Sequence, residues 1–233
     1  DIPISSPPKR LVSLVPSVTE SLFVMGLGNS LVGITDYCTD PPEAVKNLKR
    51  IGGPKNPRAD EIVALRPDLV IANKEENARE TVEVLLNQGV PVWVTFPKTV
   101  REALDDLLKL AAIYQSQQAG RQVENLLRIL DLFEASCADQ QPISYFCPIW
   151  QEEIVGGIQW WMTFNQDTYP HDVLRLSGGS NIFATRNRRY PMEADLGLVP
   201  EGVSNDRDVR YPRVTLDEVL QADPELILLP TEP

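Results

Sequence analysis

The sequence DEIVALRPDLVIA at residues 60–72 returns near the other end of the chain as DEVLQADPELILL at residues 217–229. The two copies align without a gap, with Pro67 opposite Pro224 and an aliphatic run after each proline. The acids that open each copy suit the positive end of a helix dipole, and the proline stops the helix. The aliphatic run is typical of a buried parallel strand. Two copies this far apart predict two similar α/β lobes, because a solenoid needs at least three repeats at a short period.

The first hundred or so residues predict one α/β lobe. Apolar runs indicate strands at residues 10–15, 31–34, 69–72 and 90–95, with helical segments between them. Ser17 and Glu20 match the capping-box pattern, so we expect Ser17 to be the N-cap of a helix that ends at Gly26 or Gly28. The resulting order of alternating strands and helices, with short connections, favours right-handed crossovers.

The stretch 99–135 contains almost no helix breaker except Gly120. An apolar stripe at helical spacing runs through its second part, at Val123, Leu126, Leu127, Leu130 and Phe133. An unbroken helix of this length would span roughly 50 Å, more than one small lobe needs. We therefore expect a break near residues 115–120, followed by a helix of about twenty residues that carries the chain from the first lobe to the second. Two ordinary surface helices of the first lobe remain the alternative.

The second half predicts another lobe, with a strand at residues 143–148, a dense aromatic segment at 154–164 and a helix at 169–176. Residues 186–213 are polar and contain several prolines, and the triplet Arg189-Tyr190-Pro191 recurs there as Arg210-Tyr211-Pro212. That stretch is typical of a long functional loop or a local insertion.

The expected fold class is therefore α/β, with two lobes that contain mainly parallel sheets and are joined by one long interdomain helix. The N-terminal lobe covers residues 1–98, the helical segment 99–137 and the C-terminal lobe 138–233. The three cysteines have no metal-type spacing, and their odd number makes a complete disulfide framework impossible.

The formal charge of −11 argues against a nucleic-acid partner, because phosphate binding needs clustered Lys and Arg. No run approaches the roughly eighteen apolar residues of a membrane span. The first residues show no basic-then-apolar leader, so we expect either a cytosolic protein or one whose leader has been removed.

The familiar enzyme motifs are missing from the sequence. There is no nucleophile elbow, P-loop, H-E-x-x-H or C-x-x-C pattern. His171 is the single histidine, so neither a catalytic triad nor a multi-histidine metal site can be built around it. A carboxylate pair for acid–base chemistry stays an open alternative, because 33 acids offer many pairings. We expect no catalytic residue and no metal ligand.

The remaining candidates for a site are aromatic. Tyr37, Trp160, Trp161 and Tyr211 lie at expected strand ends or loops rather than on regular apolar faces. Large flat side chains at a cleft bury much area for little lost entropy, which suits a flat or bulky ligand. The alternative for the tryptophans is that they fill the core of the second lobe.

Several segments of the chain together resemble one known family. They are RLVSLVPSVTE at residues 10–20, LVGIT at 31–35, Asn56-Pro57 and PDLVI at 67–71. The resemblance is to the cobalamin-binding branch of the class III ABC-transporter solute-binding proteins, the helical backbone metal receptor group, whose other members bind siderophores and haem. It covers nearly the whole chain. It implies two α/β lobes joined by a rigid helix, with a ligand in the cleft between them.

The resemblance also implies ligand-binding residues. Tyr37 falls where the family has a cleft tyrosine, and Tyr211 falls at one of its cleft tryptophans. A second cleft tryptophan falls near Gly53 and Pro54, so that contact is absent from this sequence. Aromatic residues of the second lobe could supply the missing ring, namely Trp160, Trp161 and Phe164.

Two acidic pairs are implied to dock onto the transporter. In such proteins one acid on each lobe pairs with arginines of the membrane permease, and these positions correspond to Asp60 and Asp217. Glu61 and Glu218 lie beside them as substitutes. Family members usually continue beyond the last residues of this sequence with a final helix, so we expect that the C-terminal lobe lacks it here.

The leading hypothesis is therefore a non-catalytic, monomeric receptor outside the cytoplasm. It would capture a corrinoid or a similar metal chelate as its transported ligand, without a covalent cofactor, and deliver it to an ABC permease and its ATPase. A siderophore or haem receptor of the same fold is the first alternative. An enzyme that processes a bound corrinoid and a sensor domain that signals through a partner are the others.

Overall fold

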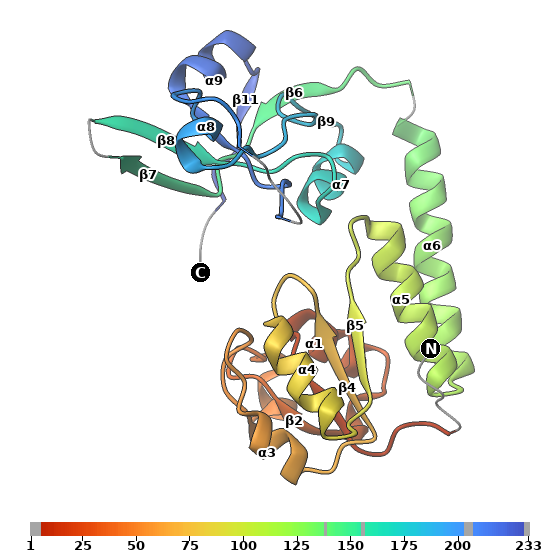
Figure 1. Cartoon of the computed structure of the whole chain (residues 1–233). Coiled ribbons are helices and arrows are strands. Elements are labelled where there is room, and N and C mark those ends of the chain that lie inside the picture. Colours follow the sequence, from red (N-terminus) through yellow and green to blue (C-terminus); the bar gives the residue numbers. More distant parts are fainter. Residues whose placement is uncertain (1–5, 138, 155–156, 203–206, 231–233) are drawn as a thin grey trace. The chain divides into compact units, whose positions relative to one another are not determined.

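A computed structural model of the 233-residue chain describes residues 6–137, 139–154, 157–202 and 207–230 (Figure 1). The chain divides into two compact units. Unit 1 comprises residues 1–97 and 101–129, and unit 2 comprises residues 98–100 and 130–233. The boundary falls inside the long helix α6 (Gln117–Cys137), so this helix contributes to both units. The expected helical segment 99–137 is thus divided between the units, and most of α5 (Val100–Ile113) belongs to unit 1.

The sheet of unit 1 is wholly parallel, with the strand order β3-β2-β1-β4-β5. Its strands are β1 (Leu11–Ser13), β2 (Leu31–Ile34), β3 (Lys49–Arg50), β4 (Leu69–Asn73) and β5 (Val92–Thr95). The four strands expected from the sequence are confirmed. The short edge strand β3 was not expected, because Lys49 and Arg50 carry no apolar signal and pair only with the end of β2.

Helices cover both faces of this sheet. They are α1 (Pro16–Val24), η1 (Gly28–Ser30), α2 (Pro42–Val45), α3 (Ala59–Ala64), α4 (Arg79–Asn87), α5 and the first part of α6. Leu69 and Ile71 of β4 pack into one core cluster with residues of α1, α5 and α6, whereas Val70 packs into a second cluster with residues of α3 and α4. Both faces of the strand are therefore buried, which explains its continuous apolar sequence.

The expected capping box is wrong. Helix α1 begins at Pro16, its N-cap is Val15, and no side chain caps its first turn. Proline fits the first helical position because its ring presets φ and its missing N–H would have had no partner there. The end of the helix agrees with the sequence, since Met25 is the C-cap and Gly26 follows with φ 73°.

The expected break in the helical segment is confirmed. Helix α5 ends at Ile113, and α6 begins at Gln117 and runs for 21 residues. Gln115 between them adopts a left-handed backbone with φ 52°, which an α-helix cannot contain.

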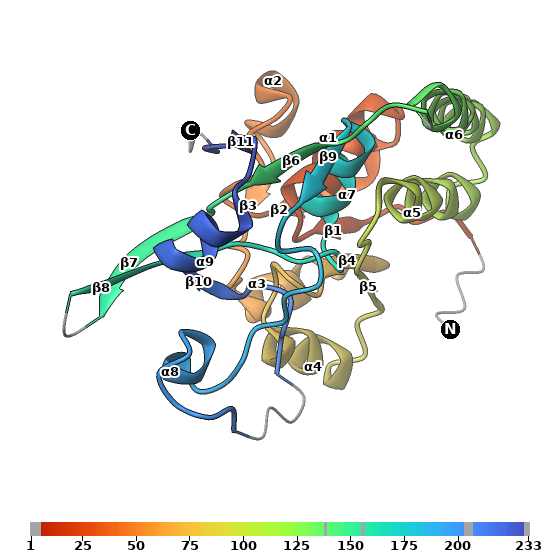
Figure 2. The same ribbon diagram turned by 90° about the horizontal axis from the view of Figure 1, so that it is seen from above.

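The described residues of unit 2 form two three-stranded sheets. The parallel sheet has the order β11-β6-β9, and the antiparallel sheet has the order β10-β8-β7. Figures 1 and 2 show β7 and β8 side by side as a hairpin. The elements are β6 (Ile143–Phe146), β7 (Trp150–Ile154), β8 (Ile158–Met162), α7 (Tyr169–Leu176), β9 (Gly179–Asn181), α8 (Met192–Asp195), β10 (Arg213–Thr215), α9 (Leu216–Ala222) and β11 (Leu226–Ile227). The expected positions of Trp160 and Trp161 at a strand end or loop are wrong, because both lie inside β8.

The sequence repeat is also a repeat of backbone conformation. In each copy a helix (α3 or α9) is followed by a proline and a strand (β4 or β11). The residue before each proline is left-handed, with φ 46° at Arg66 and φ 45° at Asp223. The copies differ in burial: Leu69–Ala72 are fully buried between β1 and β5, whereas Leu226 and Ile227 are exposed on a strand that pairs, within the described residues, with β6 alone.

Candidate functional site

The exposed ring of Tyr37 stands on a turn that directly follows β2 in unit 1. The side chain is 67% exposed, although the residue after it, Cys38, is fully buried. Ligands of open parallel sheets bind beyond the carboxyl ends of the strands, and Tyr37 lies at such an end. An added Cβ on Gly53 would lie 3.6 Å from the Cε2 atom of Tyr37, so the edge of the ring rests beside the backbone of Gly53.

The turn that carries Tyr37 is held from several sides. The guanidinium of Arg50 donates to the carbonyl oxygens of Thr35 (2.8 Å) and Cys38 (2.7 Å). The amide of Asp36 donates to the carbonyl of Gly52 at 2.9 Å, and the thiol sulfur of Cys38 accepts a hydrogen bond from buried Thr19 at 3.2 Å. Tyr37 is thus an exposed aromatic ring on a fixed support, the arrangement that costs a binding site least entropy.

The two tryptophans of β8 point to opposite faces of the antiparallel sheet, as successive strand residues must. Trp160 is only 2% exposed, and the guanidinium carbon of Arg213 lies 5.0 Å from its ring centroid. The indole N–H of Trp160 has no hydrogen-bond acceptor within the described residues. Trp161 is half-buried and packs against a small core cluster that includes Phe146 and Val214. The sheet therefore cannot present both rings to one ligand on the same face.

Phe164 and Tyr211 come together in a second cluster of unit 2. Phe164 is 1% exposed, while Tyr211 is half-buried and packs against the cluster from its edge. The guanidinium carbon of Arg210 lies 5.4 Å from the Tyr211 ring centroid. In this structure Phe164 and Trp160 are core residues, because their rings are enclosed by protein. Within unit 2, Trp161 and Tyr211 keep partly accessible rings, and the ligand contacts expected of all four residues stay a prediction.

The acids at the start of α3 have different surroundings. Asp60 is exposed and makes no ion pair with any described residue. Glu61 pairs with Lys49 at 2.6 Å and with Arg58 at 2.5 Å. Hydrogen bonds from Lys49 and from Arg58 hold the pKa of Glu61 below its ordinary value. Glu61 is thus engaged within unit 1, whereas the carboxylate of Asp60 faces solvent.

The two acids at the start of α9 differ in the same way as Asp60 and Glu61. Glu218 forms a capping box with Thr215, in which each side chain hydrogen-bonds the backbone amide of the other residue. Glu218 also lies 3.5 Å from the guanidinium of Arg186. Asp217 is exposed and has no ion-pair partner among the residues that the structure describes. Each repeat therefore presents one solvent-facing aspartate beside one engaged glutamate.

The single histidine and the three cysteines form no further site in the described residues. His171 on α7 is partly buried, and burial lowers its pKa. Its Nδ1 atom lies 3.4 Å from the side-chain amide of Asn181. All three cysteines are free thiols. In the described parts of the chain, no group of three His, Cys, Asp or Glu side chains could hold a metal ion.

A cavity of about 350 Å³ lies in unit 1 beside β5 and α5. Its charged lining consists of Glu102, Asp105, Asp106 and Lys109, and Lys109 is already paired with Asp106 at 2.7 Å. None of the expected ligand-binding residues lines it. We assign the cavity no function, because size alone does not make a site.

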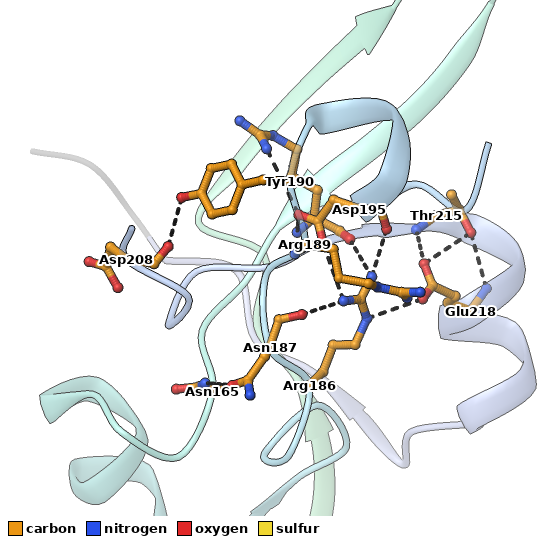
Figure 3. A network of polar contacts seen from close by, with 10 residues as sticks. Asn165, Arg186, Asn187, Arg189, Tyr190, Asp195, Asp208, Thr215 and Glu218 are labelled. Atoms are coloured by element: carbon orange, nitrogen blue, oxygen red, sulfur yellow. Dashed lines mark hydrogen bonds and ion pairs between the residues drawn. The ribbon is translucent and has the colours of Figure 1, made fainter. Parts of the chain in front are cut away.

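Sequence reasoning missed a polar network in unit 2 that is centred on Asp195 (Figure 3). This carboxylate is fully buried, and it accepts the backbone amides of Arg189 (2.9 Å) and Arg213 (2.8 Å). The guanidinium of Arg186 lies 3.1 Å from it, and that of Arg213 lies 3.8 Å away. The signal in the sequence was the repeated Arg-Tyr-Pro triplet, because one copy begins at Arg189 and the other ends just before Arg213, the two residues whose amides bind Asp195.

The family model described as "periplasmic binding protein" matches residues 11–232. The chain belongs to this family. It consists of binding proteins rather than enzymes, and its members work with the permeases of ABC transporters. No helix in the described parts of this family member combines the length and the apolar character that a membrane crossing requires.

Two relatives of this periplasmic binding protein are named as vitamin B12-binding proteins. The protein of Vibrio cholerae serotype O1 is 29% identical over 223 residues, which are 95% of this chain and 70% of the relative. The protein of Yersinia pestis is 28% identical over 222 residues, which are 95% of this chain and 69% of the relative.

Solved structures agree with the fold. The crystal structure of the periplasmic vitamin B12 binding protein of Vibrio cholerae matches with a TM-score of 0.72 at 27% identity, covering 96% of this chain and 76% of that one. A periplasmic haem-binding protein of Roseiflexus matches with a TM-score of 0.63 at 23% identity, covering 97% and 76%. The second likeness concerns the fold alone. Together they confirm the expected class III architecture with its long helix.

Proposed function

We propose that this periplasmic binding protein captures a corrinoid, or a closely related metal chelate, outside the cytoplasm and delivers it to an ABC importer. The observation that carries the proposal is the exposed Tyr37 ring, held on an anchored turn at the carboxyl end of β2. A rigid exposed ring suits a large flat ligand, because its contact face is formed before the ligand arrives. The similarity to vitamin B12-binding proteins over 95% of the chain supports a corrinoid in particular.

Tyr37 is the residue that we place first in the ligand contact, with Trp161 and Tyr211 as partly accessible contributors from unit 2. Trp160 and Phe164 support them from within the core. A flat chelate supplies the equatorial ligands of its own metal, so the protein does not have to build the whole coordination sphere. The chain itself therefore supplies shape and aromatic surface.

A direct titration tests the ligand. Cyanocobalamin, cobinamide and haem would each be added to the purified chain while tryptophan fluorescence and calorimetric heats are followed. We expect saturable binding of one equivalent of a corrinoid, with haem as the competing alternative. If haem binds and neither corrinoid does, the ligand is a porphyrin chelate. If none of the three binds, the proposed ligand class is wrong.

We also propose that Asp60 and Asp217 dock onto the permease. Both are exposed carboxylates at equivalent positions of the repeat, and each stands beside a glutamate that is already engaged. Reversing both charges, Asp60→Lys with Asp217→Lys, should abolish uptake in cells with the cognate transporter while ligand affinity stays unchanged. The matched control reverses two other exposed acids, Glu80→Lys with Glu124→Lys, which lie on α4 and α6 outside both copies of the repeat. Loss of ligand binding in the double variant would assign these acids to the binding site or the fold instead.

A further inference from the structure

Unit 2 contains an arginine-rich stretch, residues 186–213, that the proposed function does not use. The whole chain has a formal charge of −11, yet residues 186–213 contain six arginines against five acids. The stretch as a whole is therefore close to neutral, and what matters is which of its arginines lack a carboxylate partner.

Several of these arginines are neutralised by described carboxylates. Arg186 pairs with Asp195 at 3.1 Å and with Glu218 at 3.5 Å. Asp208 receives a two-pronged interaction from Arg210, at 2.9 Å to Oδ1 and 2.6 Å to Oδ2. These pairs hold segments of the loop together, and their charges are matched.

Arg188, Arg189 and Arg207 have no carboxylate within ion-pair distance among the described residues, and two of them, Arg188 and Arg207, contact the same aromatic ring. The guanidinium carbon of each of these two lies 4.9 Å from the ring centroid of Tyr190, so the two cations are at most twice that distance apart. The ring is fixed, because its hydroxyl donates to the backbone carbonyl of Asp208 at 2.7 Å. The Nε atom of Arg188 is buried and lacks a hydrogen-bond acceptor within the described residues. A buried charged donor without an acceptor is costly, so an added acceptor near this guanidinium would be stabilising.

The surroundings add to the shortage of negative charge. Burial lowers the pKa of Arg213, and repulsion from Arg188 lowers it further, while Asp195, Tyr190 and Glu152 of β7 oppose the change. Burial raises the pKa of Asp208, but hydrogen bonds from Arg210 and the charge of Arg188 outweigh it, and the net pKa is lowered. Arg188 thus sits near a second cation and near an acid whose hydrogen bonds go to Arg210.

We propose that Arg188 and Arg207, aligned on the ring of Tyr190, bind an oxyanion carried by the captured ligand, either a carboxylate or a phosphate. This inference rests on the proposed function and narrows it, because it selects chelates that carry such a group. Guanidinium groups match carboxylate and phosphate oxygens in a two-pronged geometry, and stacking on an aromatic ring restricts them in advance. The aromatic residues would contact the flat body of the ligand, and this pair of arginines would recognise its charged arm.

The first experiment compares ligands that differ in the charged group. Cobalamin carries a phosphodiester that cobinamide lacks, and haem carries two carboxylates that its dimethyl ester lacks. Affinities for both pairs would be measured with the wild type, Arg188→Gln, Arg207→Gln and the double variant. Arg121→Gln is the matched control, because Arg121 is an exposed arginine of α6 without a described partner.

We expect the wild type to bind the anionic member of at least one pair about tenfold more tightly or better, the scale of one charge-assisted hydrogen bond. The double variant should lose this preference, and the Arg121 control should keep it. Arg207 is exposed, so Arg207→Gln should fold normally and show a partial loss even if the Arg188 variant is unstable. An unchanged ratio of affinities in Arg207→Gln and in the folded double variant would overturn the proposal.

A second measurement separates this inference from the ligand claim. Citrate and pyrophosphate would be titrated into the chain without any chelate. Binding that disappears in Arg207→Gln, in a chain that ignores every chelate, would support the oxyanion site and refute the corrinoid proposal. Chelate binding without any preference for the anionic member of each pair would support the proposed ligand class and refute the oxyanion site. If neither the chelates nor the simple anions bind, both proposals are wrong.

Discussion

Removal of the Tyr37 ring is the sharpest test of the proposed ligand contact. A tyrosine side chain offers roughly 150–250 Å² of surface, and 67% of Tyr37 is exposed, which leaves about 150 Å² accessible. A flat ligand that covers one face would bury about half of this area. At about 25 cal/mol per Å², the contact contributes about 2 kcal/mol, or roughly 30-fold in the dissociation constant.

The assay is isothermal titration of Tyr37→Ala, with Tyr37→Phe as the matched control that keeps the ring. We expect the alanine variant to bind about 30-fold more weakly and the phenylalanine variant to stay within about threefold of the wild type. Because the ring is exposed and the turn is held by Arg50, Gly52 and Thr19, neither change should alter the free energy of unfolding by more than about 0.5 kcal/mol.

Two results would refute the reasoning about Tyr37. An alanine variant that folds and binds as tightly as the wild type would show that the ring faces solvent in the complex as well. A loss of stability that matches the loss of affinity would show that Tyr37 supports the turn rather than the ligand.

Three further predictions concern stability. Trp160→Ala should lower the free energy of unfolding by about 3–5 kcal/mol, because it leaves a cavity in the core. Trp150→Ala on the same hairpin should lower it only slightly, because Trp150 is 57% exposed. Equal effects of the two variants in chemical denaturation would contradict the assignment of Trp160 to the core. Burial lowers the pKa of His171 in the folded chain from its ordinary value of 6.5. The neutral imidazole therefore contributes to the free energy of unfolding in full above pH 6.5, and this contribution is lost as the pH falls through the folded pKa. His171→Gln should lose less stability between pH 7.5 and 5.5 than the wild type, and parallel curves of urea midpoint against pH would contradict this. Asp223→Gly should raise the free energy of unfolding by about 0.5–1 kcal/mol, and Asp223→Ala should lower it. The reason is that the backbone of Asp223 has φ 45°, which glycine adopts freely and alanine only with strain. Thermal unfolding of the two variants checks the sign of each change.

The fold could be read from local patterns where burial and local preference agree. The apolar strands of unit 1, the 21-residue helix and the helix at Tyr169–Leu176 all follow from such patterns. The capping box failed because two local signals competed, and Pro16 determined where the helix begins. The edge strand β3 depends on pairing with β2, and the antiparallel sheet depends on pairing of β8 with the distant strand β10, which a local pattern does not record.

The candidate site was predictable only in part. Tyr37 stood out because it lies in a polar loop after a clear strand, and the structure exposes it there. Trp160 and Phe164 carried the same aromatic signal and are buried, because a sequence does not tell which face of a strand is enclosed. The stacking of Arg188 and Arg207 on Tyr190 depends on a tertiary arrangement, so only the repeated triplet that contains Tyr190 was visible in advance.

The buried carboxylate of Asp195 has a consequence for how this family member could change its ligand. Asp195 accepts hydrogen bonds from the backbone amides of Arg189 and Arg213, so residues 196–212 start after Asp195 and end at a residue that Asp195 binds. The entropy needed to close such a loop grows only with the logarithm of its length, and each doubling costs about 0.6 kcal/mol. Segments of different length and charge could therefore be exchanged between these two anchors while β10 keeps its place in the sheet. A graft of residues 196–212 from a relative would exchange Arg207 and leave Arg188 and Tyr190 in place, so it would change one of the two proposed oxyanion contacts without a redesign of the fold.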